Sequence, residues 1–128
     1  MSNVINTPHA PAAIGPYVQG IDLGNMVLTS GQLPLDPVSG TMPQGVAEQT
    51  RQSLENVKAI VDAAGLSVAS IVKTTVFVKD LNAFTAVNAA YEAFFSAHGA
   101  PFPARSYVEV ARLPKDALIE IEAIAVRR

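Results

Sequence analysis

Arg105 is the first residue whose type and setting could do chemistry. It lies in the segment FPARSYVEV, residues 102–110, whose alternation is typical of a β-strand. A guanidinium is a planar fork of N–H donors that matches a carboxylate through two parallel hydrogen bonds, and an ammonium offers no such fork. Because a buried charge without a partner is costly, Arg105 needs an anion. That anion is either a carboxylate of the same chain, at Glu109, Glu120 or Glu122, or the carboxylate of a ligand.

Glu120 is the second candidate for a chemical role. It lies in LIEIEAIAV, residues 118–126, where acidic and apolar residues alternate. A glutamate at such a position either is a solvated strand residue or serves as a general acid, a general base or a group that positions water. Glu122 shares its face, so the alternation alone does not distinguish the two carboxylates.

Two polar segments near the N-terminus combine hydroxyl groups with backbone donors. They are PYVQG, residues 16–20, and TSGQLP, residues 29–34. Gly31, which has no side chain, either lets a ligand approach the backbone or marks a bulge. Asn88 lies in the middle of a predicted helix, where it is either a surface residue or reaches into a pocket.

Several kinds of chemistry are disfavoured by what the sequence lacks. The two histidines, His9 and His98, are scattered and form no recognisable triad with Ser30 and no metal site. The absence of cysteine removes disulfides, thiolate nucleophiles and cysteine-bound metals, and it is compatible with a cytoplasmic location. There is no G-x-G-x-x-G and no P-loop, so we expect no nucleotide cofactor.

Length, composition and charge narrow the class of protein. The 128 residues predict a single domain, 1–128, with a core that needs no metal or disulfide. A net charge of −2 without a basic stripe counts against a nucleic-acid binder. The N-terminal segment is polar and Pro-rich, so no signal peptide is expected. No apolar run approaches the ~20 residues of a membrane helix.

Two segments have the apolar spacing of amphipathic helices. The first covers residues 44–64 and the second residues 81–98, and a glycine that stops the helix follows each of them. Asp80 or Asn82 can cap the start of the second helix. The apolar faces are expected to consist of Leu54, Val57, Ile60, Val61 and Ala64 in the first helix, and of Phe84, Val87, Tyr91, Phe94 and Phe95 in the second.

The remaining segments alternate or are rich in β-branched residues. They predict strands at 27–35, 70–78, 104–110 and 118–126, and a weaker strand at 17–23. Turns are expected at 22–25 and 36–40. The order strand, strand, helix, strand, helix, strand, strand favours an α/β or α+β fold with both helices on one face of the sheet.

The opposite face of the predicted sheet is too polar for a second layer of helices. We expect it to carry Arg105, Tyr107, Glu109, Glu120 and Glu122. This face is either solvated or covered by another subunit. The strand at 70–78 is apolar on both faces apart from Lys73, Thr74 and Thr75, and such two-sided apolarity in a small domain favours an oligomer.

Four segments together resemble the reactive intermediate deaminase family, also called RidA or YjgF-like. They are APAAIGPYVQG, TSGQLPLDP, VKTTVFVKDL and FPARSYVEVARLPKDALIEIEAIAV. The resemblance runs from Ala10 to Arg128 and is most specific between Pro103 and Val126. It implies a chorismate-mutase-like fold and a homotrimer, in which the sheets form a central barrel and pockets lie at the subunit interfaces.

The resemblance also implies an activity without metal or organic cofactor. Members of the family hydrolyse enamines and imines, such as 2-aminoacrylate and 2-aminocrotonate, to 2-keto acids and ammonia. These small-molecule substrates are released by pyridoxal-phosphate enzymes, notably serine/threonine dehydratases. The chemistry suits the residues, because an imino acid carries a carboxylate beside an electrophilic C=N carbon. Such a substrate needs a fork for the carboxylate and a group that orients water.

The resemblance assigns roles to individual residues. Arg105 matches the arginine that binds the substrate carboxylate, and Glu120 matches the acid that handles the attacking water. Position 107 contributes a backbone carbonyl near that water. Many close relatives carry cysteine at this position, whereas this chain has Tyr107, which is bulkier and has no oxidisable thiol. The remaining residues that match the pocket lining are Tyr17, Ser30, Gly31 and Asn88.

Three functions compete at this point. The favoured one is a cofactor-free imine and enamine deaminase. The second is a non-catalytic trimer that binds 2-keto acids or small carboxylates, and turnover would separate it from the first. The third is the ribonuclease or translation-inhibitor activity attributed to some relatives, against which the acidic balance counts.

Overall fold

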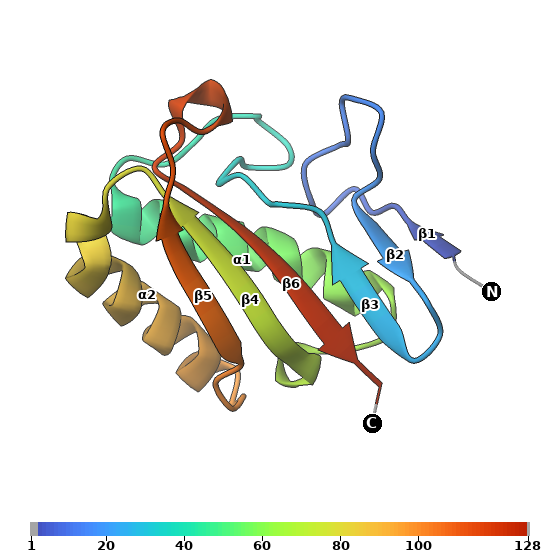
Figure 1. The fold of residues 1–128 in the computed structure, drawn as a ribbon. Coiled ribbons are helices and arrows are strands. Elements are labelled where there is room, and N and C mark those ends of the chain that lie inside the picture. The colour runs from blue at the N-terminus through green and yellow to red at the C-terminus, as the bar shows by residue number, and fades with distance from the viewer. Residues whose placement is uncertain (1–2, 128) are drawn as a thin grey trace.

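The computed structural model of the chain describes residues 3–127. Its centre is a six-stranded sheet with the order β1-β2-β3-β6-β4-β5 (Figure 1). The strands are β1 Asn3–Ile5, β2 Gly20–Asp22, β3 Met26–Thr29, β4 Ile71–Val78, β5 Ala104–Glu109 and β6 Ile119–Val126. The β4–β5 pair is parallel, and the other neighbouring strands run antiparallel.

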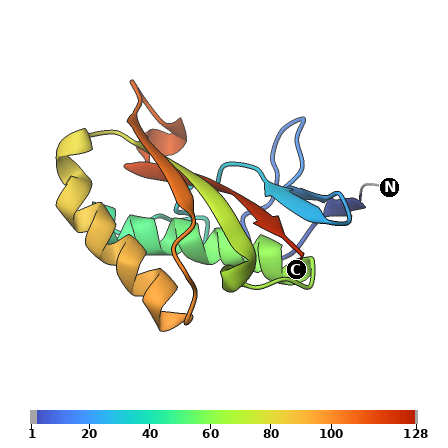
Figure 2. The same cartoon turned by 60° about the horizontal axis from the view of Figure 1, so that its bottom comes forward.

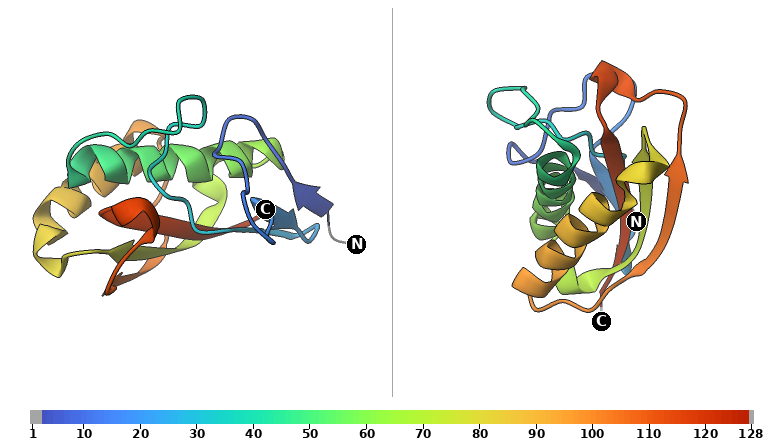
Figure 3. Two further views of the ribbon diagram at one scale, coloured as in Figure 1. Left: turned by 90° about the horizontal axis from the view of Figure 1, so that it is seen from above. Right: turned by 90° about the vertical axis from the view of Figure 1, so that its left-hand side faces the viewer.

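Two helices pack on one face of this sheet, as the sequence predicts. They are α1 Val46–Ala63 and α2 Phe84–Ala97. Figures 2 and 3 place both helices on the same side, so that the opposite face of the sheet carries no helix of the described residues. None of the helices within residues 3–127 is both long and apolar enough to cross a membrane. The predicted two-layer α+β architecture is therefore confirmed.

The core lies between the helices and the sheet. Ile119 and Ile121 of β6 are fully buried there. The helices contribute Leu54, Val57, Ile60, Val61, Val87, Tyr91, Phe94 and Phe95, all of them buried. Phe84 was also expected on the apolar face of α2, but half of its surface is exposed. The reason is that α2 begins at this residue, where the chain leaves the sheet edge.

Local signals set the ends of the elements. The Asp80 side chain accepts a hydrogen bond from the Asn82 backbone N–H at 2.9 Å, so Asp80 is the cap of the short 3₁₀ turn that leads into α2. Gly65 and Gly99 follow the two helices with φ angles of 81° and 60°, which favour glycine. In the 36–40 turn, Asp36 Oδ1 accepts hydrogen bonds from two backbone N–H groups.

The N-terminal strands differ from the prediction. β2 covers three residues rather than 17–23, and β3 ends at Thr29, after which Gln32 pairs with Ile121 in an isolated bridge. β1 was not predicted. It has three residues and pairs with β2 alone, so its existence depends on a neighbouring strand rather than on its own sequence pattern.

The pairing of β5 with β4 corrects one expectation about the faces of the sheet. Arg105 lies opposite Thr74 and Tyr107 opposite Val76, and both β4 residues are completely buried under the helices. Arg105 and Tyr107 therefore point toward the helix layer, and Glu109 accepts a hydrogen bond from the backbone N–H of Leu81 just before α2. The prediction that these three residues lie on the uncovered face is wrong, because alternation does not relate the faces of strands far apart in the sequence.

The uncovered face carries Glu120 and Glu122, as expected. Glu120 pairs with Phe77 and Glu122 with Thr75, at the positions of β4 that alternate with its buried residues. Apolar side chains lie on the same face, among them Leu28 with 37% of its surface exposed. A sheet face of mixed polarity with no helix over it is suited to contact with another protein surface.

Candidate active site

Arg105 has no carboxylate partner among residues 3–127. Its Nη1 donates a hydrogen bond to Oδ1 of Asn88 on α2 at 2.8 Å, and it takes part in none of the ion pairs of the described chain. The side chain is half-buried. The structure thus removes the intrachain ion pair as an explanation for Arg105 and leaves a guanidinium with N–H groups available to a ligand.

Aromatic rings surround this guanidinium. Its Cζ lies 4.9 Å from the centre of the Tyr91 ring and 5.2 Å from the centre of the Tyr107 ring. The Phe84 and Tyr107 rings in turn contact each other edge to face, with 5.5 Å between ring centres. An open hollow of about 520 Å³ lies beside Arg105 and is lined by Asn88, Ala89, Tyr91, Glu92, Phe102 and Arg105.

Glu120 lies in a different environment. Burial is the main reason that the pKa of its carboxyl is raised above the usual value, and the charge of Glu122 adds to the effect. A raised pKa brings a carboxylic acid closer to the range in which it can both accept and donate a proton. Glu120 therefore has the electrostatic character of an acid–base group.

Gly31 makes room for this carboxylate. A Cβ atom at Gly31 would overlap Oε2 of Glu120 and would stand 2.9 Å from its Cδ. The close approach that glycine permits here is thus made by a side chain of the same chain. Gly31 and Tyr17 also line an open hollow of about 230 Å³, to which Lys115 contributes.

Ser30 has a mainly structural contact in this chain. Its hydroxyl donates a hydrogen bond to the backbone oxygen of Val18 at 2.6 Å, and its backbone N–H donates to Gln19. These bonds hold the segment before β2 against the end of β3. Tyr17 is half-exposed beside them.

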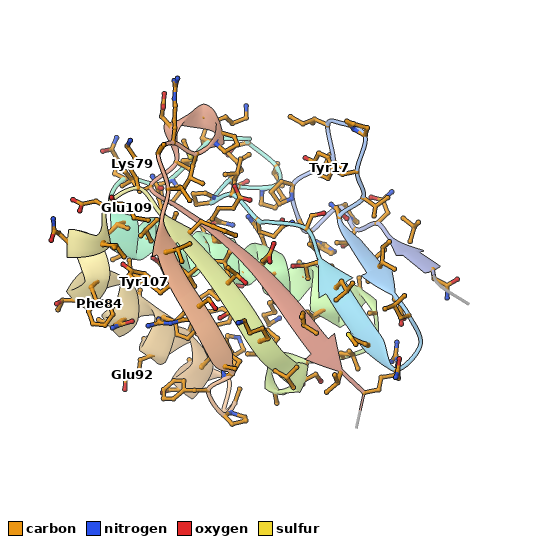
Figure 4. All side chains as sticks on the ribbon, in the orientation of Figure 1. Tyr17, Lys79, Phe84, Glu92, Tyr107 and Glu109 are labelled. Atoms are coloured by element: carbon orange, nitrogen blue, oxygen red, sulfur yellow. The ribbon has the colours of Figure 1, made fainter. Side chains whose placement is uncertain are left out.

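The predicted site residues form two separate groups. The arginine group consists of Arg105, Asn88 and Tyr107, and the glutamate group consists of Glu120, Gly31, Ser30 and Tyr17. Figure 4 places Tyr107 and Phe84 at the edge of the sheet near α2, and Tyr17 on the other side of the molecule near the N-terminal strands. Arg105 and Glu120 also point to opposite faces of the sheet, so one chain does not bring them together.

Sequence reasoning missed several residues around the site. Tyr91 was assigned to the core alone, although its spacing of three from Asn88 on a helix places both on one face. Phe102 and Glu92 border the hollow at Arg105, and Lys115 borders the one at Gly31. Lys115 lies in the short 3₁₀ turn Pro114–Asp116 and has a left-handed backbone, at φ 57°, which the sequence pattern did not predict.

Replacement of Gly31 by alanine is expected to impair Glu120 without unfolding the protein. The added methyl group displaces the carboxylate, which is the mobile end of a side chain, and a displacement of about 1 Å can cost about 10²-fold in rate. The measurement is kcat for imine hydrolysis together with the melting temperature. In a Glu120→Ala background the same change should have no further effect on kcat. An equal loss in that background would show that Gly31 acts through something other than Glu120.

The pH profile is expected to report Glu120. If the carboxylate is the active form, kcat/KM declines as the pH falls through a pKa that lies above that of an ordinary glutamate. Glu122→Gln removes a neighbouring negative charge, so it should move this decline to lower pH. Dividing kcat/KM of the variant by kcat/KM of the wild type at each pH removes the contribution of substrate titration. A profile unchanged by Glu122→Gln would contradict the assignment.

Known proteins resemble this chain along its whole length. The family model described as endoribonuclease L-PSP matches residues 7–127. The 2-iminobutanoate/2-iminopropanoate deaminase of Escherichia coli K12 is 73% identical over 128 residues, which cover 100% of both chains. The crystal structure of the YjgF gene product from E. coli has a TM-score of 0.97 at 72% identity, covering 98% of this chain and 99% of that one. The structure of E. coli TdcF with bound serine has a TM-score of 0.97 at 61% identity and the same coverage.

Proposed function

This chain belongs to the endoribonuclease L-PSP family, also called the YjgF or RidA family, and we propose that it is a 2-iminobutanoate/2-iminopropanoate deaminase. The observation that carries the proposal is 73% identity over the full length of a deaminase of that name. The reaction adds water to the C=N bond of a 2-imino acid and releases ammonia and a 2-keto acid. Residues 1–128 act as one domain in this proposal, and the enzyme works in the cytoplasm, where pyridoxal-phosphate enzymes release such imines.

Arg105 binds the substrate carboxylate in this mechanism. Its charge has no anionic partner among residues 3–127, and Asn88 holds one end of the guanidinium. A carboxylate bound by the remaining N–H groups would form charge-assisted hydrogen bonds. Binding at this point fixes the imine carbon relative to the protein and converts the attack of water into a positioned event.

Glu120 handles the proton transfers. The substrate reacts as the protonated imine. Glu120 accepts a proton from the attacking water as the water oxygen bonds to the imine carbon and the C=N electron pair moves to nitrogen, which gives a neutral carbinolamine. Glu120 then returns this proton to the nitrogen. The C–N bond breaks and ammonia leaves as the C=O bond forms, while Glu120 takes the proton of the carbinolamine hydroxyl and passes it to the departing ammonia. The raised pKa of Glu120 suits a group that gives and takes a proton in one cycle.

We propose that the complete site forms between subunits of a homotrimer. Arg105 and Glu120 project from opposite faces of the sheet of one chain, so a small imino acid cannot contact both within that chain. A heterologous contact, in which the arginine group of one subunit meets the glutamate group of the next, closes into a ring. The uncovered face of the sheet, which carries Glu120 and the exposed Leu28, is available for such contacts.

Mixing two inactive variants tests the shared site. Arg105→Ala and Glu120→Gln subunits are unfolded together, mixed in equal amounts and refolded. Random assembly should restore about a quarter of wild-type activity, since a site is complete only where an intact arginine meets an intact glutamate. Each variant treated alone is the control. If the activity of the mixture does not exceed that of the controls, both residues of a site come from one chain.

The test of the activity itself traps the substrate. An amino-acid oxidase with catalase generates 2-iminopropanoate from alanine, and semicarbazide traps the free imine as a chromophore. The protein should slow the appearance of the semicarbazone, and Arg105→Ala should not. If the wild type does not slow trapping but binds 2-oxobutanoate, the protein is a carboxylate-binding trimer. An RNA-cleavage assay alongside tests the ribonuclease activity that the family name implies, which the net charge of −2 does not favour.

A further inference from the structure

The guanidinium of Arg105 is fixed by contacts that leave its charge intact. A salt bridge would orient an arginine but would compete with a substrate carboxylate. Here the guanidinium is oriented instead by one hydrogen bond to the neutral amide of Asn88 and by contacts with two aromatic rings. The face of a tyrosine ring attracts a cation without neutralising it. The N–H groups at the rim of the guanidinium plane stay free for an anion.

Tyr91 is built into the core beneath this arrangement. It is 6% exposed, and its hydroxyl lies 2.6 Å from the hydroxyl of Thr74, a completely buried residue of β4. Thr74 is the residue opposite Arg105 in the sheet. The strand pair thus sets the Arg105 backbone and the Tyr91 ring in one fixed relation. Burial raises the pKa of Tyr91, so the phenol stays neutral at neutral pH and does not pair ionically with Arg105.

Tyr107 contributes a ring but makes no use of its hydroxyl. The Tyr107 oxygen is buried and has no hydrogen-bond partner within residues 3–127. This oxygen has essentially no exposed surface in the single chain. An unsatisfied buried hydroxyl is a cost to stability. The T-shaped contact with Phe84 restricts the plane of the Tyr107 ring, and the ring lies next to Arg105. What this position contributes is therefore the aromatic face.

We propose that the ring of Tyr107, together with that of Tyr91, is a positioning element that holds Arg105 ready for the substrate carboxylate. The inference rests on the proposed deaminase function. It gives the side chain at position 107 a role beyond the backbone carbonyl that the family resemblance implies. A cysteine there, as in many relatives, has no aromatic face to offer. An arginine side chain has several rotatable bonds. Because the rings already restrict these bonds in the free protein, less conformational entropy is lost when the substrate binds, and the affinity is higher.

The experiment compares three variants at position 107. Tyr107→Phe keeps the ring, and Tyr107→Leu and Tyr107→Cys remove it. The affinity for 2-oxobutanoate is measured by calorimetry, and kcat and KM are measured with 2-iminobutanoate. Loss of the ring should raise Kd and KM about 3- to 30-fold, since a cation–π contact has about that strength. The value of kcat should change little, because the ring supports binding of ground state and transition state alike.

Tyr107→Phe separates the ring from the hydroxyl and from general packing. Because it keeps the ring, its Kd and KM should rise far less than those of Tyr107→Leu and Tyr107→Cys. Its melting temperature should be equal to that of the wild type or higher, because the unpaired hydroxyl is gone. A Kd raised as much in Tyr107→Phe as in Tyr107→Leu would overturn the proposal. So would an unchanged Kd in both ring-removing variants. Melting temperatures of all variants establish that the trimers compared are folded.

Arg105→Ala distinguishes failure of this inference from failure of the proposed function. In that background, Tyr107→Leu should not weaken 2-oxobutanoate binding any further, since the ring has lost the group that it positions. If Arg105→Ala itself binds 2-oxobutanoate as the wild type does, the carboxylate is bound elsewhere and the proposed site is wrong. If Arg105→Ala weakens binding and Tyr107→Leu alone does not, the proposed carboxylate site is supported and only the proposal of aromatic positioning is contradicted.

Discussion

Arg105→Ala is expected to reduce kcat/KM for 2-iminopropanoate by about 10²–10⁴-fold, because hydrogen bonds to a charged group contribute about 1.5–3 kcal/mol each and the fork supplies two of them. The loss should fall mainly on KM and on the affinity for 2-oxobutanoate. Arg105→Lys should recover part of it, since an ammonium retains the charge but not the planar fork. Steady-state kinetics and calorimetry measure both quantities.

Arg51→Ala is the matched control for this experiment. Arg51 lies on the outer surface of α1 with 54% of its side chain exposed, and it pairs with Glu48 rather than with a site residue. Exposed ion pairs of this kind contribute little to stability or activity. If Arg105→Ala retained wild-type kcat/KM, the carboxylate would be bound by another cation. Lys115, which lines the hollow beside Gly31, would then be the next residue to replace.

Glu120→Gln is expected to lower kcat by about 10²–10⁴-fold, the usual contribution of a group that transfers protons. The affinity for 2-oxobutanoate should stay near the wild-type value, because the keto acid is bound through its carboxylate. Glutamine has nearly the same shape as glutamate but cannot accept the proton of water. Single-turnover and steady-state rates of imine hydrolysis measure the loss, and a kcat equal to that of the wild type would exclude Glu120 from the chemistry.

Glu122→Gln is the control for Glu120, because it removes a carboxylate from the same face of the same strand. Its kcat should fall far less. Stability provides a second check. The pKa of Glu120 is raised on folding, so its charged form is disfavoured in the folded state and lowers stability at pH values above that pKa. Glu120→Gln should therefore unfold at an equal or higher temperature at neutral pH, which separates loss of chemistry from loss of structure.

The sequence by itself determined the local elements and the kinds of chemistry available. The spacing of Leu54, Val57 and Ile60 fixes the buried face of α1, and glycines after both helices fix their ends. These signals act between residues close in the chain, so they can be read without a structure. The same holds for the capacity of an arginine to bind a carboxylate and of a glutamate to transfer a proton, since those properties belong to the side chains themselves. The alternation did not choose between Glu120 and Glu122, and only the family resemblance favoured Glu120.

The tertiary structure decided which residues meet. The parallel pairing of β5 with β4 turns Arg105 toward α2, where it contacts Asn88 and the rings of Tyr91 and Tyr107. It also separates Arg105 from Glu120, although both strands alternate in the same way. Alternation specifies two faces within one strand, whereas hydrogen bonds between strands distant in sequence decide which faces coincide. For this reason the sequence contained both groups of the proposed site, and only the folded sheet placed them on opposite sides of one chain.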